Sequence, residues 1–213
     1  MMKKIGLGIC VALLGAGAAF GGLLNDEPGE LTLSGRGWIP GDGDFDLFED
    51  GYGVSLSYRE WFHFPWAVGV SVGVAHWEVD DGSDAYKYPM LTGYEGDALL
   101  IPLGVSLYFS MIDWDNWNLN LKTGVEYLFV DSNVSVFNNE ENVKARQDVD
   151  IGNAILWNVG AEYEYMIAEN AYIAGELGYQ VDVMRADTDY AGRSARDTSF
   201  RGFYLGIGVK FLF

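Results

Sequence analysis

Bulky apolar residues alternate with small or polar residues through most of this chain, most clearly in its last segment. Residues 202–213 read Gly-Phe-Tyr-Leu-Gly-Ile-Gly-Val-Lys-Phe-Leu-Phe, with an apolar residue at every second position from Phe203 to Phe213. A period of two is the side-chain period of a β-strand, so the segment is predicted to be a strand with one apolar face. That face must either pack on a protein core or contact lipid.

The same alternation recurs along the chain and predicts eight strands. We expect them at residues 29–39, 50–61, 66–79, 97–110, 117–130, 151–166, 171–184 and 199–213. The 28 glycines and the 15% aromatic content suit twisted strands better than helices. After residue 20 there is no long uninterrupted apolar run, so a membrane location would require a closed barrel.

The connections between the expected strands alternate between short and long. Residues 62–65, 111–116 and 167–170 are tight turns, whereas residues 40–49, 80–96, 131–150 and 185–198 are long and polar. Outer-membrane barrels have short periplasmic turns and long external loops. The segregation of the two kinds of connection therefore favours a barrel that spans a membrane.

Two architectures accommodate eight amphipathic strands. A soluble lipocalin-like barrel would place the apolar face inside, whereas a membrane barrel would place it outside. An eight-stranded barrel has an interior only just wide enough for side chains, and the large apolar face would overfill it. We therefore expect an all-β, eight-stranded, antiparallel up-and-down transmembrane barrel. Partition into the aqueous phase without detergent would instead reveal the soluble alternative.

The N-terminus begins Met-Met-Lys-Lys and continues with an apolar run from Ile5 to Phe20. A basic start and a short apolar stretch with small residues at its end are typical of a secretory signal peptide. We expect a cleaved signal peptide at residues 1–19, a short periplasmic segment at 20–28 and the barrel at 29–213. Cleavage would remove the only cysteine, so neither disulfides nor thiol chemistry is expected. The net charge of −18 argues against nucleic-acid binding.

The C-terminal strand resembles the assembly signal of Gram-negative outer-membrane proteins, with Tyr204, Phe211 and Phe213 as its aromatic residues. The chain from about residue 29 resembles small barrels of the OmpA/OmpX/OmpW type. The resemblance implies an outer-membrane location and contacts with outer-membrane lipids and lipopolysaccharide. It also implies that the barrel assembly machinery reads the last strand, which then closes against the first. Functions in this group include wall anchoring, adhesion, passage of small hydrophobic molecules and lipid modification.

The inward phase of the strands carries charged residues. Isolated charges in a narrow lumen are costly, so we expect them to form a salt network. The members are Arg36, Arg59, Lys122, Glu126, Glu162, Glu164, Glu176, Asp182 and Lys210. We place Arg36, Glu126 and Asp182 nearer the long loops and Glu162, Glu164, Glu176, Arg59 and Lys210 nearer the turns. The network either plugs the barrel or gates a narrow ion path.

Aromatic residues gather toward both ends of the strands. Trp and Tyr are enriched at membrane interfaces because an amphipathic ring suits a half-hydrated layer. We expect interface positions for Trp38, Trp66, Trp77, Trp114 and Trp117.

One external loop is strongly acidic. Asp42, Asp44 and Asp46 have the spacing that begins a calcium-binding loop, but Leu47 and Gly53 stand where such a loop needs Gly and Glu. A solvated acidic loop is the default reading, and no cofactor is expected. The last loop carries Arg185, Arg193 and Arg196, which could touch lipid phosphates.

Catalysis has little support in the sequence. His76 and Glu78 on one strand face are the only candidate acid–base pair. We therefore expect a non-enzymatic barrel with a filled polar lumen, acidic external loops, a structural or surface-interaction role and an unknown external ligand. The alternatives are a narrow conduit for small hydrophobic molecules, helped by Pro102 weakening the fourth strand, and a lipid-modifying enzyme.

Overall fold

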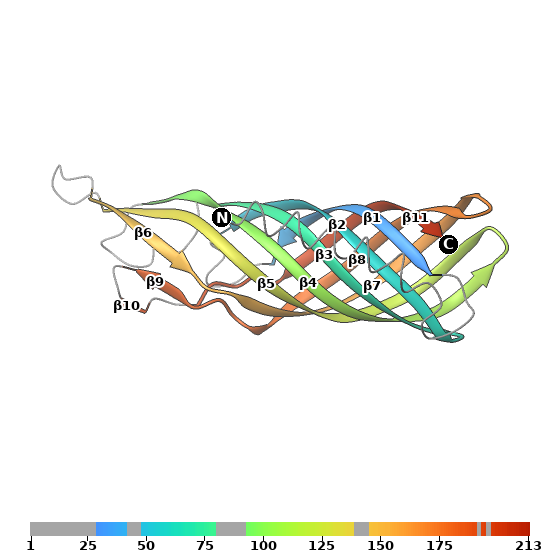
Figure 1. Cartoon of the computed structure of the whole chain (residues 1–213). Helices are drawn as coiled ribbons and strands as arrows, with labels where there is room; N and C mark the ends of the chain where they lie inside the picture. Colours follow the sequence, from blue (N-terminus) through green and yellow to red (C-terminus); the bar gives the residue numbers. More distant parts are fainter. Residues whose placement is uncertain (1–28, 42–47, 80–92, 139–144, 191–192, 195–196) are drawn as a thin grey trace.

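The computed structural model describes residues 29–41, 48–79, 93–138, 145–190, 193–194 and 197–213. Within these residues the chain forms one antiparallel β-sheet of eleven strands (Figure 1). The strands are β1 (Glu30–Pro40), β2 (Phe48–His63), β3 (Trp66–Val79), β4 (Gly93–Trp114), β5 (Trp117–Asn138), β6 (Ala145–Ile151), β7 (Ala154–Ala168), β8 (Ala171–Met184), β9 (Thr188–Tyr190), β10 (Arg193–Ser194) and β11 (Gly202–Leu212). None of the described residues belongs to a helix long and apolar enough to span a bilayer. The expected signal peptide and periplasmic segment lie outside the described residues.

Eight of the strands close into a ring. The order runs β1, β2, β3, β4, β5, β7, β8 and β11, and β11 then pairs with β1. The closing ladder extends from Glu30, which pairs with Leu212, to Pro40, which pairs with Gly202. Closure satisfies the backbone groups of both terminal strands without leaving an open edge. The expected eight-stranded up-and-down barrel is thereby confirmed.

The two ends of the barrel differ. Three connections, residues 64–65, 115–116 and 169–170, are two residues long and lie at the end where the C-terminus sits (Figure 1). Gly29 and Phe213 exchange backbone hydrogen bonds of 3.1 Å at the same end. We call this the turn end, and the opposite end, with the longer connections, the loop end.

Some strand boundaries differ from the sequence expectation. The hairpin of β4 and β5 continues past its expected limits on both sides, and only residues 115–116 form its turn. The expected loops 131–150 and 185–198 contain β6, β9 and β10, and β6 pairs with both β5 and β9 beyond the ring. The polar residues of these segments do not prevent strand formation, because a sheet in water can carry polar side chains on its faces while its backbone hydrogen bonds continue.

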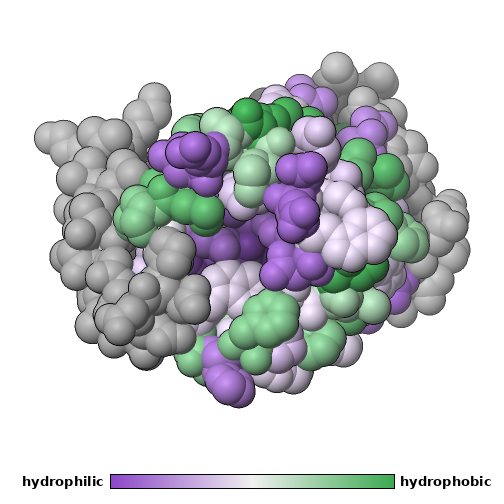
Figure 2. Space-filling view, turned by 90° about the vertical axis from the view of Figure 1, so that its right-hand side faces the viewer, coloured by the Kyte–Doolittle hydropathy of each residue, from purple (hydrophilic) through white to green (hydrophobic). Residues whose placement is uncertain are grey.

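The two faces of the wall follow the alternation of the sequence. On β11, 68% of Ile207 is exposed, whereas Tyr204 and Lys210 are each only 1% exposed. Every ring strand presents a large aliphatic residue outward, as Leu33, Val54, Val70, Val105, Val125, Val159, Leu177 and Ile207 show. A continuous apolar surface of this kind needs lipid rather than water around it. Seen from the turn end, hydrophilic residues gather at the centre (Figure 2).

Candidate functional site

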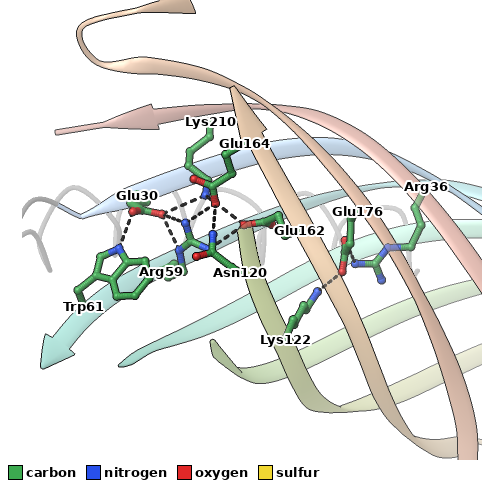
Figure 3. Close-up of polar contacts among 10 residues, drawn as sticks. All are labelled: Glu30, Arg36, Arg59, Trp61, Asn120, Lys122, Glu162, Glu164, Glu176 and Lys210. Carbon is green, nitrogen blue, oxygen red and sulfur yellow. Dashed lines mark hydrogen bonds and ion pairs between the residues drawn. The ribbon is translucent and has the colours of Figure 1, made fainter. Parts of the chain in front are cut away.

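The turn-end half of the lumen holds five charged side chains in mutual contact, here called the turn-end cluster (Figure 3). They are Glu30 of β1, Arg59 of β2, Glu162 and Glu164 of β7, and Lys210 of β11. Arg59 Nη1 donates to Glu162 Oε1 over 2.7 Å and Arg59 Nη2 to Glu164 Oε1 over 2.7 Å. Arg59 also pairs with Glu30. Each of the five is at least nine-tenths buried, so these ion pairs cross the barrel away from solvent.

Lys210 completes the turn-end cluster. Its ammonium group lies 3.2 Å from Glu30 and 3.1 Å from Glu162, and it also pairs with Glu164. Neutral donors add to these contacts, because Trp61 Nε1 donates to Glu30 over 2.6 Å and Asn120 Nδ2 donates to Glu164 over 2.7 Å. A guanidinium can serve several carboxylates at once because its planar fork carries five N–H groups.

A second group of charges, the central cluster, lies nearer the middle of the barrel (Figure 3). Glu176 of β8 accepts from Arg36 of β1 over 2.9 Å and from Lys122 of β5 over 2.6 Å. Arg36 also donates to Glu126 of β5 over 3.3 Å. The central cluster therefore has two cations and two carboxylates.

Tyr204 packs against the central cluster. The guanidinium carbon of Arg36 lies 4.8 Å from the centroid of the Tyr204 ring, which is a cation–π distance. Glycines leave room for this ring, because a Cβ on Gly160 or Gly178 would overlap the Tyr204 hydroxyl group. These inward-facing glycines thus leave the space that a large side chain from another strand occupies.

A small polar cavity separates the two clusters. Its volume is about 20 Å³, which is room for about one water molecule. Hydroxyl groups and cluster residues line it, including Ser55, Ser57, Ser71, Lys122 and Glu162. The lumen at this level is therefore filled by side chains.

Among the described residues, the loop-end half of the interior is filled mainly by apolar side chains. Large buried side chains from several strands meet there in a layer that we call the apolar plug. Its large members include Trp38, Phe48, Trp77, Leu100, Leu128, Leu156 and Phe200. The Phe200 ring stacks on Phe48 at 5.5 Å and meets Trp77 edge-on at 5.6 Å. Aromatic pairs at these distances add to the free energy of burial.

Polar side chains hold Phe200 in place. Its N–H donates to Asp182 Oδ1 over 2.9 Å, and its carbonyl accepts from Gln180 Nε2. Gln180 also accepts from Trp38 Nε1 over 3.1 Å. The segment that precedes β11 thus folds into the barrel and is hydrogen-bonded to side chains of β8.

The fold was compared with known protein families, sequences and structures. No family model and no curated protein sequence matches the chain. Solved structures do match, with OprG from Pseudomonas aeruginosa at a TM-score of 0.61 and 13% identity over 88% of this chain and 97% of that one. E. coli outer membrane protein W follows at a TM-score of 0.54 and 14% identity over 88% and 99%. The chain has the fold of a small OmpW/OmpX-like outer-membrane β-barrel.

A third match is AlkL, whose structure was determined in lipid bilayers, with a TM-score of 0.51 and 13% identity over 88% of this chain and 90% of that one. The barrel thus shares its fold with membrane proteins to which it has little sequence similarity. The expected resemblance to this group is confirmed at the level of the fold.

The structure arranges the predicted lumen charges differently from the sequence expectation. Glu176 belongs to the central cluster rather than to the turn-end group, because the tilted strands bring β8 toward Arg36 and Lys122. Asp182 is not part of either cluster: it binds the backbone of Phe200 and lies 3.9 Å from Arg185. The prediction missed Glu30, although Glu30 has the same phase as Arg36 and precedes Thr32 by two residues.

The predicted interface tryptophans divide into two groups. Trp114 is 62% exposed, Trp66 is partly exposed, and both lie near the turn end, as expected for interface residues, with Trp117 packed 4.5 Å from Trp114. The placement of Trp38 and Trp77 at the interface is wrong, because both are buried inside the barrel. Trp38 has the inward phase of Arg36 and Trp77 has that of Ala75, and this phase is the sequence signal for their burial.

The three aromatic residues of the proposed assembly signal also differ in placement. Phe211 and Phe213 face outward, and about half of each side chain is exposed. Tyr204 is buried against the central cluster. The barrel therefore uses Tyr204 as an interior packing residue, whatever role it has during assembly.

The other candidate sites gain no support. His76 lies between Glu78 and Asp97, 3.6 Å from each, with the Tyr52 ring beside it. This group places two carboxylates and an aromatic ring around a histidine. Asp42, Asp44 and Asp46 lie outside the described residues. The described part of the chain holds no cluster of ligands suited to a metal ion.

Proposed function

We propose that this barrel resides in the outer membrane as a closed, non-enzymatic scaffold that carries its loops on the cell surface. One observation supports this function most strongly. Two ion clusters and the apolar plug occupy successive levels of the interior, and the cavity between the clusters has a volume of only about 20 Å³. A hydrated ion needs a wider continuous path than this filling leaves.

Contacts with the envelope belong to the same proposal. The exposed apolar residues of all eight ring strands suit lipid acyl chains, and lipopolysaccharide would surround the loop end. The outward residues Phe211 and Phe213 stand on the strand that closes against β1, which is the position that the barrel assembly machinery would read.

Planar-bilayer recording of the purified, refolded barrel tests the closed state. We expect no current steps, with a wide porin reconstituted in the same bilayers as the positive control. Stable unitary steps from this protein would contradict the proposal, because a filled lumen offers no continuous water path.

A narrow conduit for small hydrophobic molecules is the second candidate. The ladder between β3 and β4 pairs Val72 with Leu103 and Ala75 with Leu100. The two residue pairs expected between these positions are missing, and one of them would involve Pro102. Proline has no N–H to donate to a ladder. This interruption lies beside Leu100 of the apolar plug, so a lateral route would lead from an apolar interior to lipid.

Removal of the Phe200 ring tests the conduit. If the apolar plug is a binding path, Phe200→Ala should increase the binding of naphthalene to lipid-reconstituted barrels, measured by equilibrium dialysis with protein-free bilayers as the blank. Phe203→Ala is the matched control, because Phe203 is 57% exposed on the outer face. Equal binding by the two variants would argue against the conduit.

A further inference from the structure

The turn-end cluster contains one more carboxyl group than cations. Glu30, Glu162 and Glu164 face Arg59 and Lys210. The charges of the central cluster are balanced, because Arg36 and Lys122 face Glu126 and Glu176. Its cations therefore do not compensate the additional carboxyl group of the turn-end cluster. Among the described interior residues of the two clusters, one carboxyl group is therefore in surplus.

A surplus negative charge is costly at this depth. Glu164 is 2% exposed and Glu162 is 7% exposed. Water cannot solvate a carboxylate well at such burial, and a buried carboxyl group without a matching cation commonly becomes neutral by taking up a proton.

The contacts indicate which carboxyl groups hold the proton. Both oxygens of Glu30 accept from N–H groups, one from Trp61 and the other from Arg59. The described donors to Glu162 and Glu164 all reach the Oε1 atoms. The Oε1 atoms of both side chains bind the same two cations, Arg59 and Lys210, so the two carboxyl groups lie side by side around them, and no described donor reaches either Oε2 atom.

We propose that Glu162 and Glu164 share one bound proton, which makes the turn-end cluster a proton-binding site with balanced charge. Two carboxyl groups that share the same cations in a site of low dielectric constant titrate as a pair and retain one proton between them. The other titratable groups that interact with the pair or with its immediate partners come from every neighbouring strand. They are Glu30 of β1, Arg59 of β2, Tyr108 of β4, Lys122 of β5, Tyr172 and Glu176 of β8, and Lys210 of β11.

Infrared spectroscopy of the lipid-reconstituted barrel in heavy water tests this site. At neutral pH we expect the carbonyl stretch of a protonated carboxylic acid in the parent protein. The signal should be lost in Glu164→Gln and in Glu162→Gln, because an amide replaces the neutral carboxyl group and the cluster becomes balanced without a proton. Glu126→Gln is the matched control in the central cluster and should retain the signal.

Stability provides a second measurement. Glu164→Gln should change the unfolding equilibrium constant by less than about threefold, since an amide resembles a protonated carboxyl group. Glu176→Gln removes a carboxylate that serves two cations and should raise that constant by more than about a hundredfold.

Three results would overturn the proposal. The carboxylic-acid signal could be absent from the parent, which would mean that all three carboxyl groups are ionised or that a metal cation balances them. It could also persist in both glutamine variants, which would place the proton elsewhere. Finally, Glu164→Gln could destabilise the barrel as much as Glu176→Gln does. The first result requires no variant, so the proposal stays testable if a variant fails to fold.

Discussion

Replacement of Arg59 by methionine should strongly destabilise the barrel. Methionine has similar length but no charge, so Arg59→Met leaves Glu30, Glu162 and Glu164 facing Lys210 alone. Removing one partner of a buried ion pair typically costs about 3–5 kcal/mol, because the remaining charges lose their compensation. Since Arg59 is only 4% exposed and contacts three carboxyl groups, we expect a loss within that range.

Urea unfolding of the lipid-reconstituted barrel, followed by tryptophan fluorescence, measures this loss. Arg185→Met is the matched control, because the Arg185 side chain is 51% exposed and lies 3.9 Å from Asp182. An exposed ion pair contributes about 0–1 kcal/mol, so the control should unfold nearly as the parent does. A double variant with Glu162→Gln should be less destabilised than the sum of the single changes, because the two side chains interact directly.

Unfolding of Arg59→Met within about 1 kcal/mol of Arg185→Met, which is the range of an exposed pair, would refute this expectation. Such a result would mean that water reaches the turn-end cluster and solvates its carboxylates.

Two further changes test the outer and the inner face. Ile207→Lys places a charge on the most exposed aliphatic residue of β11 and should cost about 2–4 kcal/mol in lipid, measured by the same unfolding assay, whereas equal stability would argue against lipid contact there. Gly178→Ala introduces a methyl group that overlaps the Tyr204 ring and should cost about 1–3 kcal/mol. Gly175→Ala on the same strand is its control, because nothing lies within 4 Å of the added Cβ; equal unfolding of the two variants would show that Tyr204 moves aside freely.

Local pattern was sufficient to predict the architecture. The alternation around Ile207 and Lys210 assigns each residue of β11 to a face, and the short turns at 64–65, 115–116 and 169–170 require antiparallel neighbours. Closure of β11 on β1 could be expected because a strand in lipid cannot leave its edge unpaired.

The partners across the lumen could not be read from the sequence. Glu176 meets Arg36 because strand tilt and the shear of the ring bring the two residues to the same height in the barrel. Neither quantity is encoded in the sequence of a single strand. The same limit explains why Glu176 was grouped with the wrong charges.

The apolar plug did have a sequence signal. Leu100, Leu128 and Leu156 stand on the inward phase and are large, while most inward positions nearer the turns are small, polar or charged. The change from polar to apolar filling along the inward phase indicates a layered interior. The aromatic belts alone predict Trp38 and Trp77 at the lipid interface instead, where neither residue lies.

The ion pairs of Arg59 connect distant parts of the chain. They join β2, from the first third of the sequence, to β7, which follows about a hundred residues later. A hairpin of β2 and β3 that entered hydrocarbon without Glu30 of β1 and without the glutamates of β7 would carry an unneutralised guanidinium into lipid. Insertion of this hairpin alone is therefore disfavoured, and Arg59 should remain shielded from hydrocarbon until β1 or β7 supplies a carboxylate.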